Sequence, residues 1–166
     1  KWAIECARYS PDVAVTILDH PGQVSVARRD IEQLGLENRI TCCAVDLLDH
    51  SQPLPAGFDA IWMSQFLVCF AEEDVLRLLR RAAAAMAPES RLYILETFWD
   101  RQEHEASRYS LQAISLYFTC LANGRSRMYK AADIIAMLHA AGLEVERESG
   151  ILGVCSTLLT CRKARA

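Results

Sequence analysis

The sequence lacks several features that would point to a membrane, a nucleic acid or a metal. It has no run of 18 apolar residues and no signal-peptide pattern near Lys1. Its formal net charge of −3 gives no excess of basic residues for binding nucleic acid or an anionic membrane. Its seven cysteines form no CxxC pair and no His/Cys cluster at zinc spacing. We therefore expect a cytoplasmic protein with no metal, membrane or nucleic-acid partner, which acts on small molecules or other proteins.

Glycine and proline are also few, with seven and five residues that fall singly between periodic stretches. The 166 residues contain no repeat and no low-complexity segment, and 52% of them are hydrophobic. This composition predicts one globular domain without an internal boundary.

Apolar periodicity predicts strands that alternate with helices. The strands are expected within residues 11–20, 39–48, 58–70 and 91–99, and the helices within residues 1–9, 21–34, 72–88, 101–121 and 131–141. Two alternating segments at 143–149 and 156–163 predict an antiparallel pair. The fold class is therefore α/β: a Rossmann-like, mostly parallel sheet with helices on both faces and a C-terminal antiparallel strand pair.

Polar side chains stand where the predicted parallel strands end: Asp19, Asp46, Ser64 with Gln65, and Glu96. Ligands of such sheets bind in a crevice outside the carboxyl ends of the strands. We therefore expect these side chains to line one crevice.

Asp19 and Asp46 each have two interpretations. An acid about 20 residues beyond a glycine-rich loop accepts hydrogen bonds from ribose hydroxyls, so a loop of this kind would precede Lys1. A carboxylate one strand over, Asp46, suits an adenine amino group. Alternatively, Asp19 only opens the turn before Pro21, and Asp46 is another turn acid with Asp49 as its rival.

Three segments carry a resemblance to a known family: VTILDHPGQV (15–24), NRITCCAVDLLD (38–49) and the stretch from FDAIWMSQF to LYILE (58–96). In these segments the chain resembles the class I S-adenosylmethionine-dependent methyltransferases, and within them the O-methyltransferases of small phenolic or polyketide-like acceptors. The resemblance covers most of the chain. It implies that residues 1–166 are one methyltransferase catalytic domain, truncated at its N-terminus, with S-adenosylmethionine as cofactor.

The resemblance also assigns roles to the residues at the strand ends. Asp19 would hold the ribose hydroxyls, and Asp46 with Leu47 would contact the adenine. Ser64 stands where the family often has a lysine near the cofactor. The expected cofactor-binding residues are Asp19, His20, Asp46, Leu47, Ser64 and Gln65.

The sequence departs from the family at its catalytic base. Where the family has Leu-His-Asp-Trp, this chain has Leu67 to Phe70 with the sequence LVCF, so Val68 replaces the histidine that removes the acceptor's proton. Glu96 matches the carboxylate that braces this histidine, and the sequence shows nothing else for it to brace. By position, the replacement bases are His104 and Glu96, the latter if burial raises its pKa. We favour no dedicated base over either one.

The predicted function is methyl transfer from S-adenosylmethionine to an oxygen of a small aromatic or polyene acceptor. The alternatives are a non-catalytic methyltransferase-like subunit and an NAD-dependent oxidoreductase, although the C-terminal antiparallel pair argues against the latter. A segment before Lys1 would supply the central strand and a possible homodimer contact. Without that strand the sheet should show a gap or two exposed edges, and the last strand should insert between its neighbours.

Overall fold

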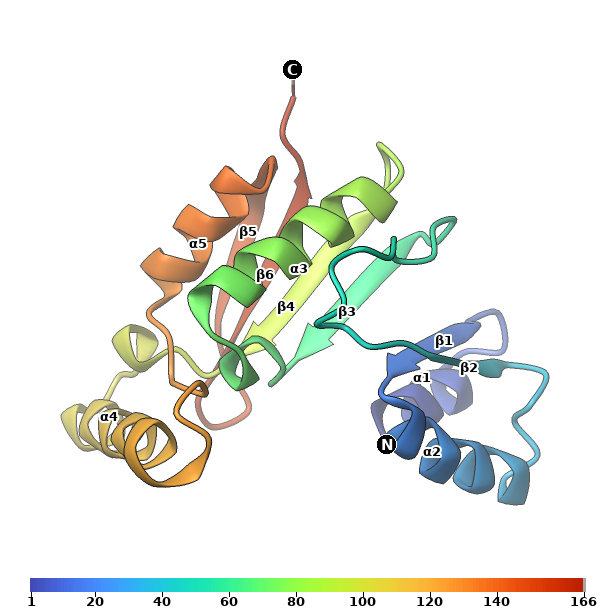
Figure 1. Cartoon of the computed structure of the whole chain (residues 1–166), viewed down its shortest axis with the longest axis horizontal. Coiled ribbons are helices and arrows are strands. Elements are labelled where there is room, and N and C mark those ends of the chain that lie inside the picture. Colours follow the sequence, from blue (N-terminus) through green and yellow to red (C-terminus); the bar gives the residue numbers. More distant parts are fainter. Residues whose placement is uncertain (166) are drawn as a thin grey trace. The chain divides into compact units, whose positions relative to one another are not determined.

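The computed structural model of the chain describes residues 1–165 (Figure 1), and of Ile151 it describes the backbone alone. The residues divide into two compact units, Lys1–Asp49 and the part that begins at His50. The described strands form two separate sheets, of two and four strands.

The first unit contains two helices and a parallel pair of strands. Its elements are α1 (Trp2–Tyr9), β1 (Val15–Asp19), α2 (Pro21–Gln33) and β2 (Ile40–Ala44). The register runs from Val15 opposite Ile40 to Asp19 opposite Ala44. Ala3 and Ala7 of α1 pack with Ile31 of α2 and Ile40 of β2 in a small apolar core. Because β1 and β2 run parallel, both strands end at the same edge.

The second unit is a mixed four-stranded sheet with three α-helices among its described residues. Its strands are β3 (Ala60–Ser64), β4 (Arg91–Glu96), β5 (Leu143–Leu152) and β6 (Ser156–Lys163), and its helices are α3 (Glu72–Ala85), α4 (Glu105–Tyr117) and α5 (Ala131–Ala140). Short 3₁₀ turns span Leu67–Cys69 and Trp99–Arg101, and a π-type turn spans Phe118–Ala122. The strand order is β3-β4-β6-β5, with β3 parallel to β4 and with β6 antiparallel to both β4 and β5.

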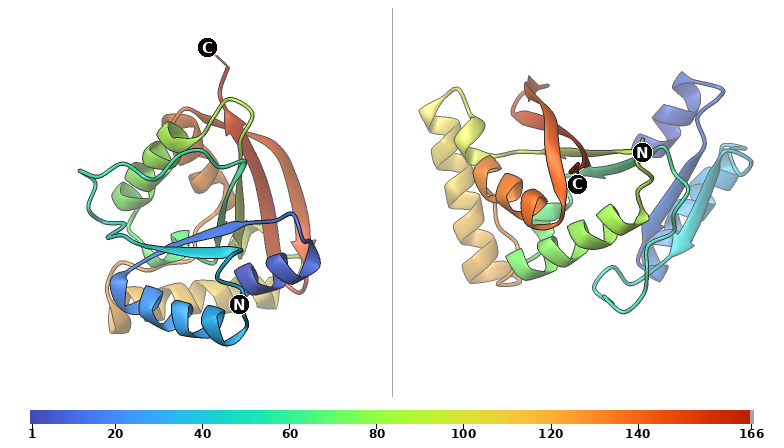
Figure 2. Two further views of the ribbon diagram at one scale, coloured as in Figure 1. Left: turned by 90° about the vertical axis from the view of Figure 1, so that its right-hand side faces the viewer. Right: turned by 90° about the horizontal axis from the view of Figure 1, so that it is seen from above.

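The core of this unit lies on one face of the sheet. Alternate residues of β4 (Leu92, Ile94 and Glu96) are buried, as period-2 strand geometry requires. Helices α3 and α5 lie on the same side of the sheet (Figure 2), and the buried positions of α3 are all apolar. Glu96 is therefore a carboxylate on the buried face of the sheet.

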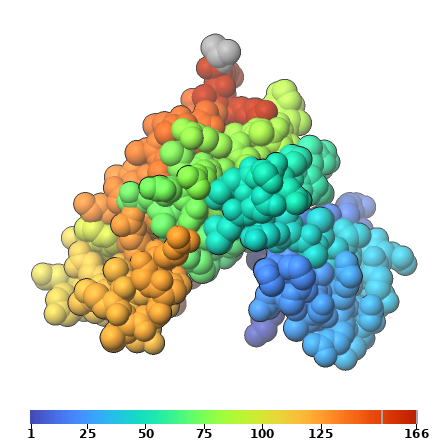
Figure 3. Space-filling model, viewed as in Figure 1, coloured from blue at the N-terminus to red at the C-terminus, as the bar shows by residue number. Residues whose placement is uncertain are grey.

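The structure confirms the α/β class and the C-terminal antiparallel pair, and β6 lies between β4 and β5, as expected for the last strand. The described strands do not form one continuous sheet, which agrees with the expected gap or exposed edges. The amphipathic stretch at 101–121 contains helix α4, which the π-type turn Phe118–Ala122 continues. Helix α4 spans 13 residues without a buried one and lies at the surface, in yellow and orange in Figure 3. Within residues 1–165, no helix is long and apolar enough to cross a membrane.

Candidate active site

Two exposed carboxylates lie at the shared edge of β1 and β2. Asp19 is the last residue of β1, and its Oδ1 accepts a hydrogen bond from the His20 backbone N–H at 2.7 Å. Asp46 follows β2 by two residues, and its Oδ1 accepts from the Leu48 N–H at 2.9 Å. An ionised carboxylate offers about four lone-pair sites, so each group can accept further hydrogen bonds from a ligand. Both acids thus lie at the carboxyl end of the first unit's sheet.

His20 and Leu47 lie next to these acids in the chain. His20 is the N-cap of α2, and its Nδ1 accepts the Gly22 N–H at 3.4 Å, with Pro21 at the first helical position. Leu47 is partly buried beside Asp46. The first unit therefore brings four of the six predicted cofactor residues to one end of its sheet.

In the second unit, the chain turns sharply after β3. Gln65 has a φ of 49°, in the left-handed region that non-glycine residues rarely adopt. Its N–H donates to the Leu95 carbonyl at 2.9 Å, and its side-chain Nε2 donates to Thr97 Oγ1 at 3.0 Å. Ser64 precedes it at the end of β3 and is partly buried. Such unfavourable backbone conformations cluster at active sites and ligand clamps.

Glu96 lies at the carboxyl end of β4 with only 1% of its surface exposed. Its Oε1 accepts hydrogen bonds from the backbone N–H groups of Phe66 at 2.7 Å and Leu67 at 2.8 Å. Burial raises the pKa of Glu96 to about 7, although the N–H groups of Phe66, Leu67 and Val68 act in the opposite direction. The sequence suggested nothing for Glu96 to brace. That expectation is wrong, because the carboxylate holds backbone N–H groups.

The carbonyl groups of the same loop, residues 66–70, bind to a second segment of the chain. Three consecutive carbonyl oxygens accept hydrogen bonds from residues 126–129: Val68 O from Arg127 N at 3.0 Å, Cys69 O from Ser126 Oγ at 3.3 Å and Phe70 O from Tyr129 Oη at 2.7 Å. Tyr129 is buried. The sequence analysis missed Ser126 and Tyr129, because contacts that run to backbone carbonyls leave no residue pattern.

The side chains of His104 and Cys69 differ in environment from that of Glu96. His104 is exposed at the N-cap of α4, makes no side-chain cap bond, and accepts through its carbonyl from the Ser107 and Arg108 N–H groups. Cys69 is also exposed, and partial burial together with the charge of Glu96 raises the pKa of its thiol. A thiol with a raised pKa is a poor nucleophile at neutral pH.

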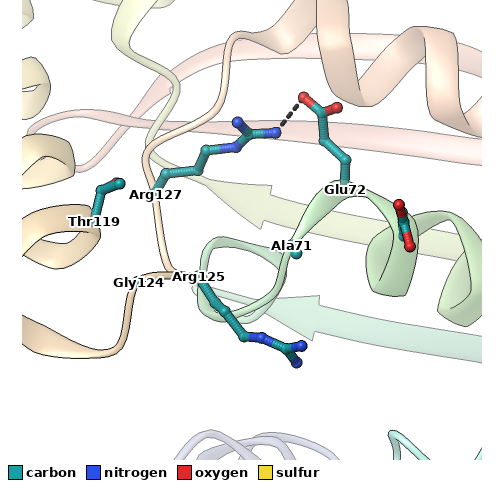
Figure 4. A pocket seen from close by; sticks show the side chains of 7 residues that line it. Ala71, Glu72, Thr119, Gly124, Arg125 and Arg127 are labelled. Atoms are coloured by element: carbon teal, nitrogen blue, oxygen red, sulfur yellow. Dashed lines mark ion pairs between the residues drawn. The ribbon is translucent and has the colours of Figure 1, made fainter.

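A surface pocket of about 300 Å³ adjoins the start of α3 (Figure 4). An ion pair between Arg127 and Glu72 lies on one side, and Arg125 pairs with Asp74 at 3.5 Å. The Arg125 side chain is largely exposed, with 64% open to solvent, and that of Arg127 is partly buried. Since the charges are paired, this pocket shows no preference for an acidic ligand. Within residues 1–165, no group of three or more His, Cys, Asp or Glu side chains could hold a metal ion.

Comparison with known proteins gives a consistent result. A model of the O-methyltransferase domain matches residues 2–144. The chain is 29% identical over 137 residues to mitomycin biosynthesis 6-O-methyltransferase of Streptomyces lavendulae, covering 82% of this chain and 37% of that protein. It is also 29% identical over 143 residues to aclacinomycin 10-hydroxylase RdmB of Streptomyces purpurascens, covering 85% of this chain and 37% of that protein.

Among solved structures, the apo form of the S-adenosylmethionine-dependent methyltransferase SibL superposes with a TM-score of 0.83 at 30% sequence identity. The match covers 98% of this chain and 47% of that one. The chain thus spans less than half the length of the relatives it matches.

Proposed function

Since the chain belongs to the O-methyltransferase domain family, we propose that it is the donor-binding part of a longer enzyme. The enzyme transfers a methyl group from S-adenosylmethionine to an oxygen of a small aromatic or polyketide-like acceptor. The observation that carries this proposal is the pair of exposed carboxylates, Asp19 and Asp46, at the ends of two adjacent parallel strands.

The geometry of the first unit fits the nucleoside part of such a donor. Asp19 is exposed and has lone pairs left for two ribose hydroxyls, and Asp46 can accept from the adenine amino group. Leu47 would offer apolar contact to the adenine ring. His20 fixes the start of α2, and with it the chain direction after Asp19. We retain Ser64 and Gln65 as proposed donor contacts from the second unit.

The acceptor loses a proton when its oxygen takes the methyl group. Bound S-adenosylmethionine would supply an electrophilic methyl group at a sulfonium sulfur. Val68 cannot accept the proton, Glu96 is buried, and His104 is solvent-exposed at the end of a helix. These positions support transfer without a dedicated base, with the proton leaving to water from an already acidic hydroxyl group. Orientation of the two reactants alone can contribute about 7–11 kcal/mol.

The direct test is an assay of the full-length protein with methyl-labelled S-adenosylmethionine and a panel of phenols, hydroxynaphthoates and polyketide aglycones. We expect labelled product from at least one hydroxylated aromatic acceptor. Because one relative is named as a hydroxylase, the same samples are analysed for hydroxylated product. Hydroxylation without methyl transfer would contradict the proposed reaction.

We further propose a cytoplasmic location and a homodimer. The seven cysteines are all free, as expected in a reducing compartment. Light scattering of the full-length protein measures the oligomeric state, and a monomer at micromolar concentration would exclude the dimer.

A further inference from the structure

Three consecutive backbone N–H groups point to the carboxylate of Glu96. Those of Phe66 and Leu67 lie 2.7 and 2.8 Å from its Oε1, and that of Val68 also lowers its pKa. Successive N–H groups that converge in this way form an anion-binding concavity. Here the concavity is filled by a side chain of the same unit, 30 residues along the chain.

This contact fixes a loop whose backbone is otherwise unfavourable. The loop follows Gln65, whose left-handed φ of 49° is disfavoured for a residue with a side chain. Glu96 binds the N–H side of the loop, and residues 126–129 bind its carbonyl side. A turn held from both sides keeps Gln65 and Val68 in one conformation.

The same geometry argues against Glu96 as a base. Only 1% of the residue is exposed, and its Oε1 is occupied by two N–H donors. The other oxygen, Oε2, is also buried and has no hydrogen-bond partner among the described residues. A base must come within hydrogen-bond reach of the proton that it abstracts. Glu96 could not do so without displacement of the loop that it holds.

We propose that Glu96 is a positioning residue: it acts on methyl transfer by fixing the backbone of the 66–70 loop, and it does not accept the acceptor's proton. This inference rests on the proposed function, since the loop begins at the proposed donor contacts Ser64 and Gln65.

The neighbourhood of Glu96 makes a glutamine substitution a sharp test. Glu96 pairs directly with Thr157 of β6, so their side chains lie on the same face of the sheet. Thr157 Oγ1 is buried and likewise has no hydrogen-bond partner among the described residues. In Glu96→Gln, the amide oxygen can still accept the loop N–H groups, and the amide nitrogen replaces Oε2, which makes no hydrogen bond among the described residues. Glutamine therefore retains the positioning contact but abolishes general-base function.

The experiment compares Glu96→Gln, Glu96→Leu and the exposed control Glu89→Gln in the full-length protein. We expect Glu96→Gln and the control to keep kcat and the KM for S-adenosylmethionine within about threefold. Glu96→Leu removes the hydrogen-bond acceptor of the loop N–H groups. We expect its kcat to fall, because misplacement of reacting groups can cost about 10²-fold in rate. A loss of about 10²–10⁴-fold in kcat for Glu96→Gln, with unchanged donor KM, would instead identify Glu96 as a base.

Amide hydrogen exchange of Phe66 and Leu67 gives a readout that does not depend on activity. Both amides should be protected in the native protein and in Glu96→Gln, and less protected in Glu96→Leu. Loss of protection in a folded Glu96→Gln variant would overturn the proposal even if Glu96→Leu does not fold. Failure of the native protein to bind S-adenosylmethionine would contradict the proposed function instead. In that case the exchange of the Phe66 and Leu67 amides still tests whether Glu96 holds the loop.

Discussion

Asp19 is the residue on which donor binding depends most strongly in this account. Its exposed carboxylate keeps one hydrogen bond, to the His20 N–H, and is otherwise open to a ligand. Hydrogen bonds that involve a charged group contribute about 1.5–3 kcal/mol. We expect Asp19→Ala to weaken binding of S-adenosylmethionine by about 10- to 100-fold in calorimetry. The matched control, Asp30→Ala on the exposed face of α2, should leave affinity unchanged. Equal affinities in the two variants would disprove the assignment.

His104 tests whether the reaction needs a base. The histidine is exposed at the start of α4 and has no side-chain cap bond. We expect His104→Ala to keep turnover within about threefold, like the control His139→Ala at the end of α5. General-base catalysis contributes about 10²–10⁴-fold. A decrease of that size, with intact donor affinity, would make His104 the base.

At this scale the sequence predicts some site residues and misses others for a physical reason. Asp19 and Asp46 could be proposed from the sequence because each directly follows an apolar run, which is a local signal. The contact between Glu96 and the 66–70 loop joins residues about 30 apart through backbone N–H groups, which have no sequence signature. The left-handed φ of Gln65 was missed because glycine usually occupies such positions.

Strand β4 places an ionisable group, Glu96, on the buried face of a sheet. The free energy of unfolding of the chain should therefore depend on pH. Burial raises the pKa of Glu96 from 4.5 to about 7. The folded state therefore holds this proton more tightly than the unfolded state does. The stabilisation is fully present below pH 4.5 and is lost as the pH rises through about 7.

Each unit of pKa difference corresponds to about 1.4 kcal/mol, so the shift from 4.5 to about 7 corresponds to about 3 kcal/mol of folding stability. Urea unfolding of the chain at pH 5 and pH 8 measures this difference. In Glu96→Gln the decrease between these two pH values should be smaller by most of that amount, because pH 5 already lies above the ordinary pKa of 4.5. A pH dependence equal to that of the native chain would show that Glu96 is already ionised at pH 5.

Elements were easier to predict than their surroundings. Helix α3 was recognised from three acids in its first turn and an apolar face, and both features are local. The amphipathic stretch at 101–121 was also helical, but it became α4, a helix without a buried residue. The periodicity of a sequence indicates which side of a helix is apolar. It does not indicate whether other residues of the same chain pack against that side.

At the scale of the whole molecule, the sequence predicted the order of elements and the position of the last strand between its neighbours. The division into two compact units was not foreseen, although Pro53, Pro55 and Gly57 follow the boundary after Asp49 and are typical of a linker. The strands of residues 1–165 form two separate sheets, and each sheet lies within one unit.

The central claim is that the strand ends bind S-adenosylmethionine, and calorimetric titration of the full-length protein tests it most directly. S-adenosylmethionine, S-adenosylhomocysteine and NAD are titrated separately under identical conditions. The account predicts saturable binding of the first two and none of NAD, because the chain belongs to the O-methyltransferase domain family. Saturable binding of NAD, or no heat with S-adenosylmethionine, would contradict it.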